Sequence, residues 1–267
     1  MGILNVTPDS FSDGGEFTSF QSAVLHAQKM IQDGVDIIDV GGQSTRPGYI
    51  ELPASAEKLR VVPVVEAIRR MSDIPISVDT YFPEVADAAL EAGANIINDV
   101  RGLDTPGMAE VIAKHKAKVI IMHSRPRDCS KSLEAELQQF YKEKVVECER
   151  LGIGSEDICF DPGVGWKGVE EDLQIIHDPN RYRLEGFPMM VGISRKRVMG
   201  YLLDEPDPKL RDLGSIAAST ILLRHGVDIV RVHNTKGMVD ALNMIKVFDD
   251  YKPLSGKWET LKDKLHK

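Results

Sequence analysis

Cysteine, a surplus of positive charge and long apolar runs are all missing or scarce in this chain. The three cysteines among its 267 residues, Cys129, Cys148 and Cys159, form no CxxC pair, so they give no zinc-ligand spacing and we expect a reducing, cytoplasmic environment. Lysine and arginine number 33 against 41 acidic residues, and the net charge of −8 argues against general nucleic-acid binding. No apolar run approaches the length that crosses a bilayer, so we expect neither a membrane segment nor a secretory signal.

Short apolar segments alternate with longer amphipathic segments, and no linker-like stretch interrupts the series. We expect strands at residues 3–6, 36–40, 75–80, 95–100, 118–123, 158–161, 188–193 and 228–233. Helical spacing is expected at 20–34, 53–71, 83–92, 107–115, 132–151, 171–177 and 236–251, with one or two helices between 195 and 225. Eight βα units predict a closed parallel (β/α)8 barrel, a TIM barrel, in a single domain over residues 1–267. An open doubly wound sheet is the alternative, and the lack of a GxGxxG at the first turn weakens it.

A polar loop follows the first expected strand. Pro8 removes a backbone donor and Gly14-Gly15 permits positive φ, so the strand has to end there. Asn5 and Asp9 are among the oxygen-bearing residues of this stretch, and such groups are also common in an ordinary surface turn.

Other expected strands end in the same way. Residues with polar side chains lie at or just beyond the carboxyl ends of the expected strands: Asn5, Asp79, Asn98, Asp161, Lys196, Arg231 and His233. In a (β/α)8 barrel these ends meet at one mouth, which is where active sites lie. A polar residue at a single strand end is usually a turn signal, but a set of this size with both charges favours a functional site.

The charges within this set indicate two kinds of contact. Asp79, Asn98 and Asp161 can accept hydrogen bonds from the N–H groups of a flat heterocycle such as an amino-pyrimidinone. Arg231 and His233 are two residues apart on one strand and so share a face. Together with Arg46 of the Gly-rich loop after the second strand, they suit a phosphate group. Asn5 and Asp9 supply the hard oxygen ligands that Mg²⁺ prefers beside substrate phosphates.

These stretches resemble the dihydropteroate synthase family over nearly the whole chain. The matching stretches occur in family order, about one per strand end: 2–15, 41–48, 76–80, 97–99, 161–163, 192–196 and 231–233. The resemblance implies a transferase of folate biosynthesis that condenses 6-hydroxymethyl-7,8-dihydropterin diphosphate with 4-aminobenzoate to give 7,8-dihydropteroate and diphosphate. It also implies a homodimer with small-molecule substrates and Mg²⁺.

Site roles follow from the resemblance position by position. The pterin-binding residues it implies are Asp79, Asn98, Asp161 and Lys196. The residues that it implies for binding the diphosphate and its Mg²⁺ are Asn5, Arg46, Arg231 and His233, with Asn5 as the metal ligand. The residues that it implies around the aminobenzoate are Phe11, Thr45, Pro47, Lys196 and Arg197. Among these residues Asp79, Lys196, Arg231 and His233 are the expected catalytic groups, on an SN1-like path in which Asp79 stabilises the pterin cation.

Several positions differ from the usual family pattern. Trp166 stands at a Phe position, Lys167 comes one residue early, and Arg197 replaces a common Ser. His123-Ser124-Arg125-Pro126 takes the place of His-Met-Arg-Gly, and Asn234 follows His233 where Asp is frequent. These changes bear on the shape of the aminobenzoate pocket more than on the chemistry.

Three alternative functions remain open at this point. The pterin-binding barrel of corrinoid-dependent methyltransferases binds methyltetrahydrofolate, but it has no reason to keep the diphosphate residues Arg46, Arg231 and His233. A non-catalytic pterin-binding paralogue is compatible with the altered loops. A Schiff-base aldolase is disfavoured, because the sixth expected strand carries no lysine.

Overall fold

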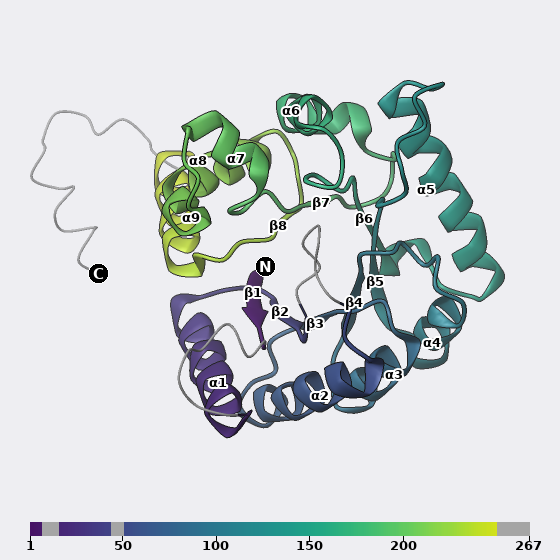
Figure 1. Cartoon of the computed structure of the whole chain (residues 1–267), viewed down its shortest axis with the longest axis vertical. Coiled ribbons are helices and arrows are strands. Elements are labelled where there is room, and N and C mark those ends of the chain that lie inside the picture. Colours follow the sequence, from purple (N-terminus) through teal and green to yellow (C-terminus); the bar gives the residue numbers. More distant parts are fainter. Residues whose placement is uncertain (7–15, 44–50, 250–267) are drawn as a thin grey trace, which may run out of the picture.

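A computed structural model describes residues 1–6, 16–43 and 51–249, without the side chains of 16–19. Its strands run parallel and follow one another around a closed wall with the helices outside (Figure 1). The strands are β1 (Gly2–Asn5), β2 (Ile38–Gly41), β3 (Ile76–Asp79), β4 (Ile96–Asp99), β5 (Lys118–Met122), β6 (Ile158–Asp161), β7 (Met190–Val191) and β8 (Ile229–Val230). β1 to β6 form one continuous sheet, and β7 pairs with β8.

Single bridges close the two gaps in the wall. Phe160 of β6 bridges to Met189, and Gly2 of β1 bridges to Val232. At the second gap the amide of Ile3 donates to the carbonyl of Val232 over 2.9 Å, and the amide of Val232 donates to the carbonyl of Met1 over 3.0 Å. The predicted (β/α)8 barrel is therefore confirmed, whereas the prediction that one domain spans all 267 residues reaches beyond the described part.

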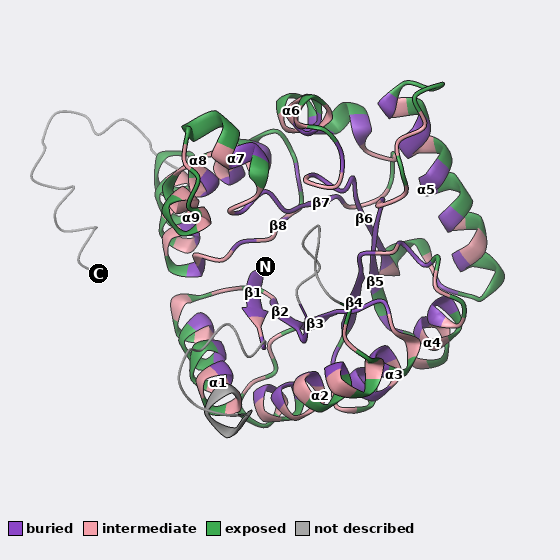
Figure 2. Cartoon of the chain, viewed as in Figure 1, coloured by how far each residue is buried: buried purple, intermediate pink, exposed green. Residues whose placement is uncertain are grey.

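The helices form the outer ring, and their buried faces turn toward the strands (Figure 2). They are α1 (Glu16–Asp33), α2 (Ala54–Met71), α3 (Pro83–Glu91), α4 (Met108–His115), α5 (Leu133–Arg150), α6 (Val169–His177), α7 (Arg197–Leu203), α8 (Asp212–Arg224) and α9 (Thr235–Asp249). Short 3-10 turns lie at η2 (Ser155–Asp157), η3 (Pro179–Tyr182) and η4 (Pro208–Arg211). No helix of these described ranges is long and apolar enough to cross a membrane.

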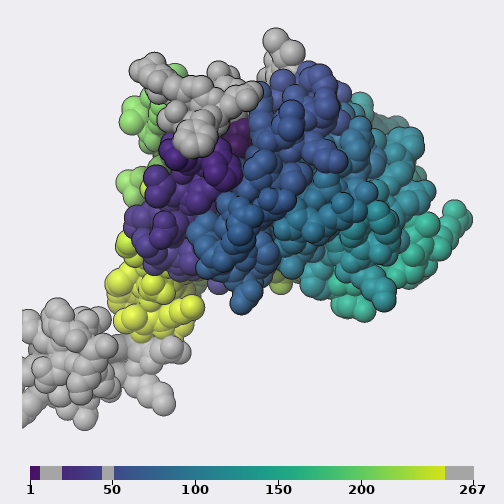
Figure 3. Space-filling view, turned by 90° about the horizontal axis from the view of Figure 1, so that it is seen from below, coloured from purple at the N-terminus to yellow at the C-terminus, as the bar shows by residue number. Residues whose placement is uncertain are grey.

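Local sequence signals explain where several helices begin. Pro83 occupies the first position of α3, where its missing N–H is not needed. The hydroxyl of Ser132 accepts a hydrogen bond from the amide of Ala135 over 3.1 Å and caps α5. The helices pack in chain order from α1 to α5 and from α6 to α9, η3 lies between α5 and α6, and α9 contacts α1. The face seen in Figure 3 shows the start of the chain, in purple, beside the yellow segment that precedes the C-terminal tail.

β7 and β8 are shorter than the six-residue strands predicted at 188–193 and 228–233. Side chains replace main-chain partners at both ends of this pair. The carboxylate of Asp228 accepts from the amide of Met189 over 2.8 Å, and the hydroxyl of Ser194 accepts from the amide of His233 over 3.1 Å. The chain stays extended, but regular ladder pairing is confined to the middle.

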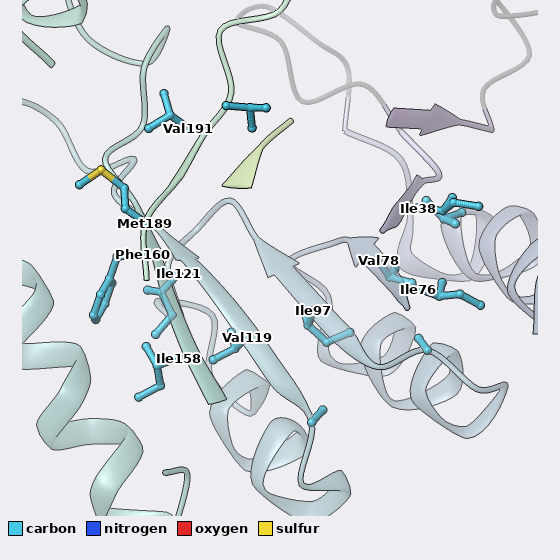
Figure 4. Close-up of a cluster of buried hydrophobic side chains, with 14 of the residues drawn as sticks. Ile38, Ile76, Val78, Ile97, Val119, Ile121, Ile158, Phe160, Met189 and Val191 are labelled. Carbon is cyan, nitrogen blue, oxygen red and sulfur yellow. The ribbon is translucent and has the colours of Figure 1, made fainter. Parts of the chain in front are cut away.

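Apolar side chains fill the space between strands and helices, as the cluster around Ile76, Ile97, Val119 and Phe160 shows (Figure 4). Inside the barrel a separate apolar layer closes the amino-terminal end of the strands. It consists of Met1, Ile96, Ile120, Cys159 and Met190, with Ile37 and Ile229 against it. Cys159 is therefore a packing residue. Because strand side chains alternate, the next inward positions above this layer are the ones that carry the polar residues.

Candidate active site

Polar side chains occupy one level on neighbouring strands at the carboxyl end of the barrel. The register pairs Asn5 with Gly41, Gly41 with Asp79, and Asp79 with Asn98. A Cβ on Gly41 would lie 3.6 Å from Oδ1 of Asn5 and 3.7 Å from Cβ of Asp79. Glycine at this position therefore keeps open the space between the two side chains.

Arg231 crosses the mouth from the strand β8 side and joins two carboxylates. Its Nε donates to Oδ2 of Asp39 over 2.6 Å, and its Nη2 donates to Oδ2 of Asp79 over 2.7 Å. Burial raises the pKa of Asp79 to about 7; the charge of Arg231 opposes this rise and that of Asp39 adds to it. Asp79 thus sits close to its titration point near neutral pH, with its charge held in place by the guanidinium.

Asn98 and Asp79 each leave one acceptor without a protein partner. Nδ2 of Asn98 donates to Oδ2 of Asp39 over 3.3 Å, so the amide oxygen is turned away from that carboxylate. Oδ1 of Asn98 and Oδ1 of Asp79 are buried and make no hydrogen bond with the described residues. Buried acceptors of this kind are costly unless a ligand satisfies them. They lie on adjacent strands, as a heterocycle edge with neighbouring N–H donors requires.

A second acid, Asp161, lies at the end of β6 beside Lys196. Oδ1 of Asp161 accepts from the amide of Gly163 over 2.8 Å, and burial raises the pKa of the carboxyl group against the opposing charge of Lys196. Gly163 has a φ of 76°, and a Cβ there would lie 2.1 Å from the carbonyl oxygen of His123, so only glycine fits. The ammonium of Lys196 donates to the carbonyl of Val164, and burial lowers its pKa.

Lys167, which departs from the family pattern, ties two loops together below this pair. Its ammonium donates to the carbonyl of Pro162 over 2.7 Å and to that of His123 over 3.3 Å. Burial lowers its pKa to about 8. His123 is 1% exposed, and its Nε2 lies 3.4 Å from Oε1 of Glu136, so it is a core residue. Trp166 is partly buried and packs against Tyr81 and its neighbours Val100 and Met122.

Side-chain contacts hold the loop after β7 that carries Lys196. Arg195 has a φ of 59°, which is uncommon for a residue with a side chain. Its guanidinium donates to both oxygens of Asp212 over 2.6 and 2.7 Å, and its amide donates to the hydroxyl of Ser215 over 3.0 Å. Arg211 also donates to the carbonyl of Arg195 over 3.1 Å. These contacts fix an otherwise strained backbone one residue before the lysine.

His233 lies next to the same loop. Oγ of Ser194 is 3.0 Å from Nδ1 of His233 and also accepts the His233 amide. The hydroxyl has its own proton to donate to Nδ1, and in the tautomer of His233 that accepts it the ring proton lies on Nε2. Arg197 is exposed at the start of α7 and donates to the carbonyl of Lys167 over 2.9 Å.

The structure brings together most of the predicted residues. Seven of them share the mouth: Asn5, Asp79, Asn98, Asp161, Lys196, Arg231 and His233. Phe11, Thr45, Arg46 and Pro47, with Asp9, lie outside the described residues. Their predicted roles therefore stay predictions.

A cluster of ionisable side chains outside the mouth joins α3 and α4. His115 is half-buried, and its Nε2 lies 2.6 Å from Oδ1 of Asp87. Asp87, Glu91 and His115 bring possible ligand atoms within 4.8 Å of one another. The ammonium of Lys114 is already 2.6 Å from Asp87, so this is a surface ion-pair network between α3 and α4.

Residues 1–233 match the model of a family described as "Pterin binding enzyme". A dihydropteroate synthase from Synechocystis sp. is 43% identical over 247 residues, covering 89% of this chain and 86% of the relative. The chain belongs to the dihydropteroate synthase family. The solved synthase from Xanthomonas albilineans with 4-aminobenzoic acid has a TM-score of 0.88 and 38% identity, covering 94% of this chain and 93% of that one. The same enzyme in complex with 7,8-dihydropteroate has a TM-score of 0.85 at 36% identity, with the same coverage of both chains.

Membership in the dihydropteroate synthase family makes this chain a transferase built on a TIM barrel, as predicted. Sequence reasoning did not select Asp39, although it lies on an expected strand and faces the barrel interior. The signal was available, because an acid within an apolar strand needs a buried partner. Ser194, Asp212 and Ser215 were missed for another reason: their contacts join segments far apart in the sequence.

Proposed function

We propose that the barrel mouth of this synthase joins 6-hydroxymethyl-7,8-dihydropterin diphosphate to 4-aminobenzoate, releasing 7,8-dihydropteroate and diphosphate. The observation that carries the proposal is the pair of unpartnered buried acceptors, Oδ1 of Asp79 and Oδ1 of Asn98, on adjacent strands. They suit the N–H donors along the pterin edge. The Xanthomonas albilineans synthase structures with 4-aminobenzoic acid and with 7,8-dihydropteroate support the choice of substrates.

The pterin is held by acids and by one amide. Asp79 and Asn98 accept from its ring N–H groups, while Asp161 and Lys196 contact it from the β6 and β7 side. The buried surroundings that raise the pKa of Asp79 also strengthen its interaction with a cation. A charge that develops on the ring would therefore be stabilised in place.

The reaction then proceeds by an SN1-like path. The bond between the exocyclic methylene carbon and the diphosphate oxygen breaks, and its electron pair leaves with the diphosphate. The pterin ring delocalises the resulting positive charge, which Asp79 faces. The amine nitrogen of 4-aminobenzoate attacks the methylene carbon, and its extra proton passes to solvent. No nucleophilic side chain is needed.

Cations on the β8 side receive the leaving group. His233 offers a ring N–H in the tautomer whose Nδ1 accepts from Ser194, and Arg231, the cation of the pair, keeps its Nη1 side clear of the carboxylates that it binds. Arg46 is proposed for the same anion from its loop. Thr45, Pro47, Phe11 and Arg197 are proposed around the aminobenzoate.

Asn5 fits a Mg²⁺ site at the diphosphate. Its amide oxygen is a hard ligand that faces the space kept open by Gly41, and Mg²⁺ commonly takes few protein ligands together with substrate phosphates. When bound, the ion would neutralise part of the diphosphate charge. Chelator should abolish turnover while leaving the binding of a pterin without diphosphate intact, and unchanged turnover would remove the metal from the proposal.

The proposal further includes a homodimer. Large apolar side chains are exposed on the surface of α7, η4 and α8: Tyr201, Leu202, Leu203, Leu210, Leu213 and Ile221. α7 and α8 pack closely enough that a Cβ on Gly214 would lie 2.6 Å from Leu203, so the surface is continuous. A second copy would bury it. Leu213→Glu should produce monomers in analytical ultracentrifugation, whereas Leu59→Glu on α2 should not, and a wild-type monomer would refute pairing.

A cytoplasmic location is the last part of the proposal. Cys129 is exposed as a free thiol, and Cys148 and Cys159 are buried and unpaired. Free thiols persist in reducing compartments. Cell fractionation would test this directly.

Diphosphate release, measured with and without 4-aminobenzoate, tests the reaction. We expect dihydropteroate and diphosphate to form in equal amounts when both substrates are present. Pterin binding without any diphosphate release would favour a non-catalytic paralogue. Methyl transfer from methyltetrahydrofolate to a cobalamin would favour the corrinoid-dependent class.

A further inference from the structure

Asp39 lies under the proposed pterin site and connects two of its residues. It is 0% exposed in the middle of β2. Its Oδ2 accepts from Nε of Arg231 over 2.6 Å and from Nδ2 of Asn98 over 3.3 Å. One oxygen on β2 thus holds side chains from β4 and from the end of β8.

We propose that Asp39 is a positioning residue. It orients the Asn98 amide so that the oxygen faces the pterin, and it orients the Arg231 guanidinium so that its remaining N–H groups face the anion. This inference deepens the function proposed above and rests on it. Asp39 itself need not touch either substrate.

The orientation of the Asn98 amide follows from the chemistry of its partner. An ionised carboxylate only accepts hydrogen bonds, so the atom of Asn98 that faces Asp39 has to be the nitrogen. The oxygen is then left as an acceptor, buried and without a partner among the described residues. An asparagine at position 39 would both donate and accept, so either orientation of Asn98 would be allowed. The fixed acceptor for the pterin would be lost.

The position of Arg231 depends on Asp39 in the same way. The carboxylate of Asp39 accepts from Nε of Arg231 and that of Asp79 accepts from Nη2, so two carboxylates share one guanidinium. Without Asp39, Arg231 is free to form a bidentate pair with Asp79 alone, which is the favoured geometry for such partners. Its remaining donors would then turn away from an incoming anion.

Stability alone does not explain an acid at this position. Oδ1 of Asp39 is buried and has no hydrogen-bond partner in the described part of the chain, and a buried ion pair is weak evidence of stabilisation. Ser77, the partner of Asp39 in the β2–β3 register, is also 0% exposed with an unpartnered hydroxyl. It is therefore a matched control on the same inner face.

The test compares Asp39→Asn with Ser77→Ala in the full chain. We expect Asp39→Asn to remain folded and to weaken the binding of pterin without diphosphate about tenfold or more, the scale of one misdirected charge-assisted hydrogen bond. Calorimetric titration measures this, and Ser77→Ala should leave the affinity unchanged. In an Asn98→Ala background, Asp39→Asn should cause a clearly smaller loss of pterin affinity, since the positioned amide is absent and only the altered Arg231–Asp79 pair remains.

The pH dependence of kcat/KM separates positioning from a purely structural role, because a purely structural role of Asp39 would not shift it. Asp39, Glu57 and Asp99 all raise the pKa of Asp79, whereas Arg231 lowers it. Removing the charge of Asp39 should therefore shift the acid limb of kcat/KM to lower pH.

An unchanged pterin affinity together with an unshifted acid limb would overturn the proposal. So would an equal loss of affinity in the Asn98→Ala background. If both Asp39→Asn and Asp39→Ser failed to fold, the role would be structural and the proposal would also fall. If the wild type released no diphosphate, the proposed reaction would fail, but the pterin titrations would still decide the role of Asp39.

Discussion

The barrel wall has two unlike parts, a regular arc from β1 to β6 and a short arc of β7 and β8 (Figure 1). The regular arc is held by continuous ladder pairing between neighbouring strands. The short arc pairs in register over two residues on each strand and joins its neighbours through single bridges. Side chains such as Ser194 and Asp228 supply the missing contacts.

The two arcs also carry different chemistry. The acids and the amide of the site, Asp39, Asp79, Asn98 and Asp161, lie on the regular arc, where ladder bonds fix their backbone. The cations Lys196 and Arg231, together with His233, follow the strands of the short arc. In the proposed mechanism, the acceptors for the pterin ring thus come from a rigid wall, while the groups proposed for the leaving anion depend on side-chain contacts. Substitutions that affect one arc at a time can test this division.

Asp79→Asn should have the largest effect. It removes the charge that faces the developing pterin cation while keeping the size of the side chain. We expect kcat to fall by about two to three orders of magnitude, the scale of losing one electrostatic stabiliser. Steady-state kinetics with both substrates measures this. Asp36→Asn, a matched change at an exposed acid before β2, should leave kcat as it is. A loss below about tenfold for Asp79→Asn would place the stabilising charge elsewhere.

The pH dependence of stability should identify the same carboxylate. Burial raises the pKa of Asp79 from 3.8 to about 7, so its contribution to stability is fully present below about pH 4 and is lost as pH rises through about 7. Asparagine does not titrate. The thermal unfolding midpoint of Asp79→Asn should therefore rise relative to that of the wild type as the pH increases from about 4 to about 8. A difference that stays constant over this range would contradict the raised pKa.

Asp212→Asn acts on the short arc and should have a smaller effect. It breaks the bidentate salt bridge between Asp212 and Arg195, which holds Arg195 in its positive-φ conformation one residue before Lys196. We expect kcat/KM to fall by about tenfold, because a charge-assisted contact of about 1.5–3 kcal/mol is lost at a partly exposed site. Asp33→Asn, which breaks the surface pair with Lys29 on α1, is the control and should not alter kinetics. Wild-type kinetics for Asp212→Asn would show that the loop needs no clamp.

The regular arc could be predicted from sequence, and the short arc only in outline. Apolar periodicity located the strands of the regular arc because ladder bonds follow directly from extended backbone. At 188–193 and 228–233 the same signal overstated the regular pairing, since the contacts that end it come from the side chains of Ser194 and Asp228. Strand-end acids such as Asp79 and Asp161 were found by position. Asp39 was not: an acid within an apolar strand signals that a buried partner exists, but only the fold shows that the partner is Arg231, 192 residues away.

Two serines allow the finest comparison of the arcs. Ser132 caps α5, outside the regular arc, and accepts the amide of Ala135 over 3.1 Å, whereas Ser215 of α8 accepts the amide of Arg195 in the loop after β7 over 3.0 Å. Replacing either by alanine should cost about 1 kcal/mol of unfolding free energy, the usual value for one such contact. Only Ser215→Ala frees the backbone next to Lys196, so only this variant should lower kcat/KM. We expect a decrease of about two- to fivefold, which corresponds to at most the same ~1 kcal/mol in activation free energy. Denaturant unfolding and steady-state kinetics on both variants give the answer. Equal kinetics at equal stability loss would mean that the short arc holds its cations as firmly as the ladder holds the acids.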